Sequence, residues 1–107
     1  MYKNQRESQR IAMSIPIQLS FGTQIILLGQ IKDLSLKSAF VKVKSSICMA
    51  PHDELNFAVE ISEANPQGRI QGSARISRVT VGEGIAIYFT KMDESSTNRL
   101  QEIVSAA

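Results

Sequence analysis

The sequence of 107 residues has one cysteine, no tryptophan and no long apolar run. A single cysteine cannot form an internal disulfide, which excludes a disulfide-stapled secreted scaffold and favours a reducing compartment. The longest apolar run covers residues 25–28, far short of the ~20 residues of a membrane-spanning helix. The N-terminus carries charges but no apolar block like that of a signal peptide. The sequence therefore predicts a soluble cytoplasmic protein without membrane insertion.

The excess of one charge sign is also small, because 12 basic and 10 acidic residues leave a formal net charge of +2. A general nucleic-acid binder needs a concentrated basic face, and a barrel for single strands needs stacking aromatics. The chain has only two tyrosines and four phenylalanines, most of them on apolar faces, so neither DNA nor RNA is expected as a partner. The hydrophobic share of 43% and the charged share of 21% are ordinary for a globular chain of one domain.

The residue types of a catalytic or metal centre are sparse too. Cys48 and His52 lie four residues apart, close to Asp53. One histidine and one cysteine fall short of the four ligands of a structural zinc site. No third group is evident that would orient His52 as a base for Cys48. We expect no catalytic residue, no metal and no cofactor, and hence no enzyme.

Apolar and polar residues alternate with a period of two over several segments, which is typical of half-buried strands. Pro16 indicates that the first strand lies at an edge, a rim or a bulge, and Gly29 suggests a bulge or bend in the second. A loop is expected at residues 33–38. The predicted strands cover residues 13–21, 25–32, 39–44, 55–61, 70–76 and 85–89, with turns at 22–24, 65–68 and 82–84.

After Phe89 the period changes to that of a helix. Asp93 is a candidate N-cap, and Leu100, Ile103 and Val104 form a narrow apolar face. An isolated helix of this length is marginal in water, so it needs the strands to pack on. The predicted fold is all-β with a C-terminal helix, a six-stranded antiparallel β-barrel. Residues 13–107 are predicted to form the barrel domain, preceded by a separate segment at residues 1–12.

Two polar clusters are candidates for binding. Arg6 and Arg10 project to one side of an extended segment, and they are neighbours in a helix as well. Their guanidiniums can converge on phosphate oxygens or on the Hoogsteen edge of guanine. The alternative is a pair of solvated arginines on a mobile terminus.

The second cluster is the loop at residues 33–38. The carboxylate of Asp33 can accept two hydrogen bonds, which matches the N1–H and N2–H₂ donors of guanine, and Ser35 can donate or accept beside it. The alternative is a turn in which these side chains satisfy local backbone groups. Arg75 and Arg78 either extend a positive surface beside this cluster or are solvated strand residues.

An R-x-x-x-R motif, a strand, and then D-x-S-x-x-G before another strand resembles the bacterial PilZ domain family, whose members are receptors for the second messenger cyclic di-GMP. The match is carried by Arg6, Arg10, Asp33 and Ser35, and by the strand at residues 84–89. The resemblance implies a six-stranded antiparallel barrel and a non-enzymatic function. It also implies that residues 1–12 are a flexible ligand-binding segment, whose two arginines bind guanine and phosphate as it folds over the ligand. Asp33 and Ser35 would bind guanine from the barrel surface. The output would be a conformational change relayed to a partner protein by a monomer or homodimer.

Ser38 departs from the family pattern, because it stands where the motif has glycine. A glycine required for positive φ would make serine cost about 1 kcal/mol. A glycine required for close approach of a ligand would make the hydroxymethyl group an obstacle. The alternative function is therefore a degenerate PilZ-like interaction module that has lost nucleotide binding. The predicted site comprises Arg6, Arg10, Asp33, Ser35 and Ser38.

Overall fold

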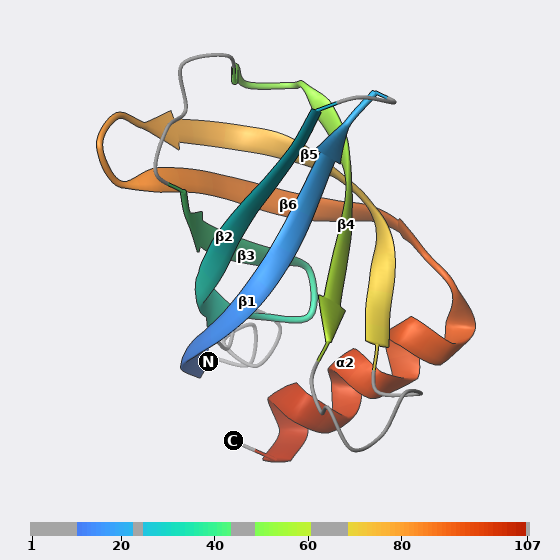
Figure 1. Cartoon of the computed structure of the whole chain (residues 1–107). Coiled ribbons are helices and arrows are strands. Elements are labelled where there is room, and N and C mark those ends of the chain that lie inside the picture. The colour runs from blue at the N-terminus through green and yellow to red at the C-terminus, as the bar shows by residue number, and fades with distance from the viewer. Residues whose placement is uncertain (1–10, 23–24, 44–48, 61–68, 107) are drawn as a thin grey trace, which may run out of the picture.

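The computed structural model describes residues 11–22, 25–43, 49–60 and 69–106. Within them, six antiparallel strands close into a barrel in the order β1-β2-β3-β6-β5-β4 (Figure 1). One helix, α2, follows the last strand. The predicted fold class is confirmed. The elements are β1 (Ile11–Phe21), β2 (Ile25–Leu34), β3 (Ser38–Lys42), β4 (Glu54–Glu60), β5 (Arg69–Thr80), β6 (Gly84–Met92) and α2 (Glu94–Ala106).

The period-two pattern places apolar side chains inside the barrel, as predicted. Ile17 and Leu19 of β1 are buried, whereas Gln18 between them is exposed. On β5 the inward positions include small residues, and Ala74 is completely buried. A pocket among the described core residues measures about 10 Å³, at the lower limit for one water molecule. This pocket is too small for a small-molecule ligand.

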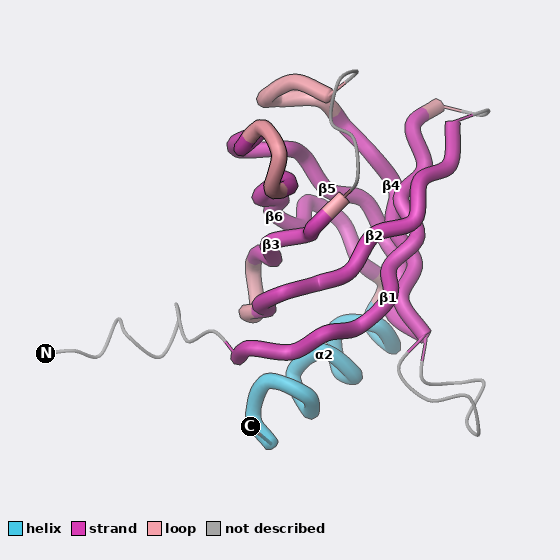
Figure 2. The backbone as a smooth tube through the Cα atoms, turned by 60° about the vertical axis from the view of Figure 1, so that its left-hand side comes forward, coloured by secondary structure: helices cyan, strands magenta, loops and turns pink. Residues whose placement is uncertain are grey.

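Helix α2 covers one end of the barrel (Figure 1, Figure 2). Its apolar face, with Leu100 and Val104, is part of the core. The predicted N-cap is confirmed, because the Ser96 N–H donates to Oδ1 of Asp93 over 2.7 Å. The buried hydroxyl of Ser96 also accepts a hydrogen bond from the Gln71 N–H at 3.0 Å, which ties the helix to β5. Among the described residues, no helix is long and apolar enough to cross a membrane.

Strand lengths differ from the prediction at several ends. β1 begins at Ile11, two residues early, and β5 extends to Thr80. β2 continues to Leu34, so Asp33 belongs to a strand and not to the loop. The predicted ends were placed where the alternation of apolar and polar side chains stops. In the structure a register shift interrupts the alternation there, but the backbone pairing continues beyond it. The predicted turn at residues 65–68 lies outside the described residues.

A bulge or a bend was predicted at Gly29, and the bulge is wrong. Gly29 pairs in regular register with Ile17, and the shifts in β2 pairing lie elsewhere. A Cβ at Gly29 would lie 2.8 Å from the carbonyl oxygen of Lys42 and 2.9 Å from Cγ1 of Val41. Glycine is therefore required for the close approach of β3. Pro16 lies between a register shift of β1 and the start of β1–β4 pairing at Ile17, as its missing N–H predicts.

Candidate functional site

A groove of about 640 Å³ crosses the outer face of the barrel. This volume is within the usual range for small-molecule sites, roughly 300–1,000 Å³. Its walls combine aromatic rings with charges of both signs, brought together from β2, β3, β5, β6 and the turn before β6. The residues that matter below are Asp33, Ser38, Phe40, Arg78, Glu83 and Tyr88.

The sheet register places a charged residue at each end of one row across the groove. Asp33 of β2 pairs with Phe40 of β3, which pairs with Ala86 of β6, which pairs with Arg78 of β5. Three strand spacings separate the ends, or about 14 Å between the backbones. Asp33 and Arg78 therefore face the same groove from opposite ends.

A β-bulge turns Arg78 into the groove. Ile76 pairs with Ile87 and Arg78 with Ala86, so Ser77 is an extra residue in the strand. Since Ile76 points inward, regular alternation would send Arg78 inward too, and the extra residue turns it outward. The Ser77 hydroxyl donates to the carbonyl oxygen of Ala86 over 3.2 Å.

A second register shift does the same for Asp33. Ile31 pairs with Val41 and Asp33 with Phe40, so Lys32 is the extra residue. The inward residue Ile31 is buried, whereas Asp33 two positions later lines the outer groove. Bulges are over-represented beside functional sites because they re-aim single side chains. Here two bulges place two side chains of opposite charge, Asp33 and Arg78, in one groove.

The two candidate arginines of β5 differ in their partners. Nη2 of Arg75 lies 2.6 Å from Oε2 of Glu54, and its Nη1 donates to the carbonyl oxygen of His52 over 3.3 Å. Arg78 is exposed and forms no salt bridge with any residue that the structure describes. Arg78 is therefore available to an anionic or acceptor group, whereas Arg75 already binds two groups of the barrel, Glu54 and the carbonyl oxygen of His52.

Ser35 is buried, with 3% of its surface exposed. Its hydroxyl accepts hydrogen bonds from the N–H groups of Ser38 and Lys37, at 3.1 and 3.3 Å. Its own N–H donates to the carbonyl oxygen of Ser38 over 2.8 Å. The loop is tied to β6 because the Phe89 N–H donates to the carbonyl oxygen of Lys37. Ser35 thus makes the local turn that was the alternative at this position.

Replacing Ser35 by alanine is expected to lower the free energy of unfolding by about 1–3 kcal/mol, because it leaves two partly buried N–H groups without their acceptor. Urea unfolding of the variant measures this loss. Ser14→Ala is the control, since the Ser14 hydroxyl donates a hydrogen bond to the exposed side chain of Gln30. Equal stability of the two variants would contradict the structural role of Ser35.

Ser38 begins β3 and pairs with Tyr88. Among the described residues other than glycine, only His52 has a positive φ. The backbone at Ser38 therefore needs no glycine, which removes the first of the two explanations for the family pattern. Its side chain lines the groove, and its Oγ lies 3.2 Å from Oγ of Ser35.

Arg6 and Arg10 lie outside the described residues. Their segment joins the barrel at Ile11, which pairs with Leu34, and the following Ala12 pairs with Asp33. The N-terminal segment is therefore attached next to the strand that carries Asp33.

Other candidate centres have structural explanations or are incomplete. Oδ2 of Asp53 accepts a hydrogen bond from the Ala50 N–H at 2.9 Å, and His52 occupies a turn with φ of 77°. Cys48 lies outside the described residues. No group of three potential metal ligands occurs in the part of the chain that the structure describes.

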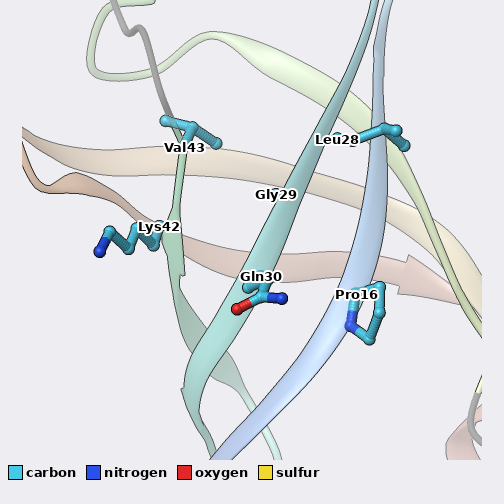
Figure 3. Close-up of a pocket in the computed structure, with 6 residues that line it drawn as sticks. All are labelled: Pro16, Leu28, Gly29, Gln30, Lys42 and Val43. Atoms are coloured by element: carbon cyan, nitrogen blue, oxygen red, sulfur yellow. The ribbon is translucent and has the colours of Figure 1, made fainter.

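A second hollow, of about 420 Å³, lies on the outer face of β1, β2 and β3 (Figure 3). It is lined by Pro16, Leu28, Gly29, Gln30, Lys42 and Val43. Figure 3 shows Leu28 and Pro16 on one side and Lys42 on the other. These lining residues include one cation and no carboxylate, so the hollow lacks the acceptor for guanine donors that Asp33 supplies in the groove.

Sequence reasoning did not identify Phe40, Glu83 and Tyr88 as groove residues, and it left the role of Arg78 open. A signal was present, because two polar residues in succession, Ser77 and Arg78, interrupt the alternation between Ile76 and Val79. Such an interruption is typical of a bulge. Its effect on Arg78 depends on the partner strand, which the sequence of β5 alone does not define.

The model of the PilZ domain family matches residues 4–106. The fold is similar to the PilZ domain of CeSA from a cellulose-synthesizing bacterium, with a TM-score of 0.69 and 22% identity over 92% of this chain and 96% of that one. It is also similar to the PilZ domain of YcgR from Escherichia coli with c-di-GMP, with a TM-score of 0.65 and 15% identity over 92% and 87% of the two chains. The inhibitor of motility MotI/DgrA of Bacillus subtilis matches with a TM-score of 0.77 and 10% identity over 91% of this chain, which spans 48% of MotI/DgrA. No curated protein matches the sequence.

Proposed function

The chain belongs to the PilZ domain family, and on that premise we propose that it is a non-enzymatic receptor for cyclic di-GMP. The observation that carries the proposal is the position of Asp33 and Ser38. Both line one outer groove, next to the point where the segment with Arg6 and Arg10 joins β1. Asp33 and Ser38 therefore support the proposal, because the segment with Arg6 and Arg10 is attached beside the strand that carries Asp33.

In this proposal the carboxylate of Asp33 accepts hydrogen bonds from N1–H and N2–H₂ of a guanine. Arg6 and Arg10 bind phosphate and guanine acceptors as their segment folds over the ligand. Charge-assisted hydrogen bonds each contribute roughly 1.5–3 kcal/mol, so a few of them offset the ordering of the segment. Ser35 acts indirectly, because its hydroxyl holds the turn between β2 and β3.

In this proposal, ligand binding is signalled by the surface that the N-terminal segment forms when it is docked on the barrel. A ligand can shift only an equilibrium between states that bind it differently. Residues 1–10 supply two of the proposed ligand contacts, so the bound state differs from the free state next to β1. We propose that a downstream protein reads this difference in the cytoplasm.

Isothermal titration of the purified protein with cyclic di-GMP tests the proposal, with GTP and cyclic GMP as controls. We expect selective binding with a Kd in the micromolar range or below, which corresponds to about 8 kcal/mol or more. The absence of both a heat of binding and a change in melting temperature would contradict the proposal.

The second candidate function is a PilZ-like interaction module without nucleotide binding, which the side chain of Ser38 in the groove favours. Ser38→Gly separates the two. In a receptor, removal of the hydroxymethyl group is expected to tighten binding of cyclic di-GMP by several-fold, about 1 kcal/mol, because the backbone at this position already has an ordinary φ. In a degenerate module, binding appears only in the variant.

A further inference from the structure

We propose that the outer side of β1 and β2 is a homodimer interface, on which a second copy of this chain packs through the same surface. The outward residues that form this uncharged face are Pro16, Gln18, Ser20, Ile26, Leu28 and Gln30. They make three rows across the two strands, because Pro16 pairs with Gln30, Gln18 with Leu28 and Ser20 with Ile26. The inference does not rest on the proposed function, since none of these residues lines the groove that contains Asp33.

The absence of charge is the first support. Charged residues make up 21% of the chain, yet none occurs between Arg10 and Lys32. Soluble proteins normally carry charges of both signs over their surface, and charged residues on exposed strands limit association. The outward side of β1 has no such residue, and the first charge of β2 is Lys32, near the end of the strand. The uncharged face therefore lacks the usual protection against contact with another protein surface.

Two large apolar side chains project from the uncharged face. Leu28 has 76% of its surface exposed, and Ile26 has 58%. Single exposed apolar residues are common on protein surfaces, but these two lie two positions apart on one strand and are therefore neighbours on one face. Gln18 and Ser20, which pair with them on β1, carry no charge that would oppose their burial. Burial of these two side chains is the expected source of affinity.

The hollow of about 420 Å³ lies beside these side chains (Figure 3). Leu28 and Pro16 stand on one side of it and Lys42 on the other. A dry cavity of about 150 Å³ holds a benzene molecule, so this hollow has room for an aliphatic side chain. The uncharged face therefore presents a projecting leucine and a space for a leucine next to each other.

This arrangement is self-complementary, which identifies a second copy as the occupant. In a two-fold symmetric interface the same surface is used twice, so each contact between two positions occurs twice. Leu28 of one copy enters the hollow of the other, where it packs on Pro16 and on the aliphatic stem of Lys42. The two ammonium groups lie on opposite sides of the two-fold axis. An unrelated partner is normally selected through complementary charge, which the uncharged face does not offer.

The size of the surface sets the expected strength of the dimer. Together with the neighbouring strands β3 and β4, β1 and β2 span about 19 Å across the strand direction. A contact of this width over about eight residues of strand covers roughly 500 Å² on each copy, or about 1,000 Å² in total. This area is close to the lower limit for a specific interface. We therefore expect a weak dimer that dissociates on dilution, with a Kd in the micromolar range.

Sedimentation velocity over a dilution series tests the proposal, without nucleotide so that the result is independent of the proposed function. The mean mass is expected to rise with concentration from that of one chain, 11.8 kDa, toward that of two. Leu28→Gln is expected to raise the Kd of the dimer about tenfold or more, because it removes the central apolar contact. Since Leu28 is exposed, an unchanged melting temperature of the dilute variant will show that it is folded.

Val81→Gln is the matched control. Val81 is 87% exposed, but it lies in the turn between β5 and β6 and not on the uncharged face. Like Leu28→Gln, this substitution replaces an exposed apolar side chain by a polar one. We expect it to leave the Kd of the dimer unchanged.

Isotope-filtered NMR on a mixture of labelled and unlabelled protein locates the interface. Contacts between the two copies are expected from the methyl groups of Leu28 to Pro16 and Val43. A single-chain mass up to about 1 mM, a concentration well above a micromolar Kd, would overturn the proposal. Equal weakening by the Leu28 and Val81 substitutions, or contacts between copies confined to another face, would overturn it as well. None of these results bears on the receptor function, which the titration with cyclic di-GMP tests separately.

Discussion

Gly84→Ala is expected to lower the free energy of unfolding by about 3 kcal/mol or more, because there is no space for a Cβ. A Cβ at this position would overlap the carbonyl oxygen of Val41, and it would lie 3.0 Å from Cα of Lys42. These are backbone atoms of β3, which cannot rotate away as a side chain can. Gly84 also has φ of +156°, which residues with a Cβ rarely adopt. Thermal unfolding is expected to show a decrease in melting temperature of roughly 10 °C or more.

Gly82→Ala is the control for this prediction. Gly82 has φ of +82°, but no atom lies within 4 Å of its Cβ position. Alanine at this position would have only the cost of the left-handed backbone conformation, which lowers the free energy of unfolding by about 1–2 kcal/mol. A Gly84 variant as stable as the Gly82 variant would show that β3 and β6 separate easily, contrary to the close contact in this barrel.

The fold was largely predictable because a barrel with a filled interior imposes period two on its strands. Ile17, Leu19 and Ile76 are buried where the alternation places them, and Asp93 caps the helix where the period changes. The role of Gly84 was not predictable in the same way. The sequence indicated a turn glycine, but the need for glycine arises from β3, more than 40 positions earlier in the chain.

Gly29 and Asp33 illustrate the same limit in β2. Gly29 was interpreted as a bulge or a bend, whereas it accommodates a neighbouring strand in regular register. The real bulge lies at Lys32. Two polar residues in succession, Lys32 and Asp33, mark it in the sequence, but this interruption of the alternation was interpreted as the start of a loop. A bulge is a property of two strands, because it is an extra residue relative to a partner, and one strand alone does not define it.

The sequence indicated which residue types belong to the candidate site, but it did not indicate how they are arranged in space. Asp33 and Ser38 do line one groove, whereas Ser35 is buried and bonded to its own turn. The groove is completed by Arg78 and Tyr88, which come from strands more than 40 positions further along the chain. The barrel order, which places β3 beside β6, brings them to Asp33.

Asp33→Ala and Arg10→Ala are each expected to lower the affinity for cyclic di-GMP by about 10- to 100-fold, the effect of losing one charge-assisted contact of roughly 1.5–3 kcal/mol. Asp33 lies in the groove and Arg10 in the segment attached next to β1. The two losses have different origins. Asp33→Ala removes the acceptor for guanine donors, and Arg10→Ala removes a contact that holds the segment over the ligand. Isothermal titration of both variants measures them.

Lys3→Ala is the matched control, because it removes one positive charge from the same segment without touching the R-x-x-x-R motif. If the arginines act through directed bonds, Lys3→Ala changes the affinity by less than about twofold, since an exposed charge at a distance is screened by salt. Arg10→Lys adds a second comparison. A lysine keeps the charge but not the planar fork, so most of the loss is expected to remain. A Lys3 variant as weak as the Arg10 variant, with affinity restored by Arg10→Lys, would mean that the segment acts only through its net charge.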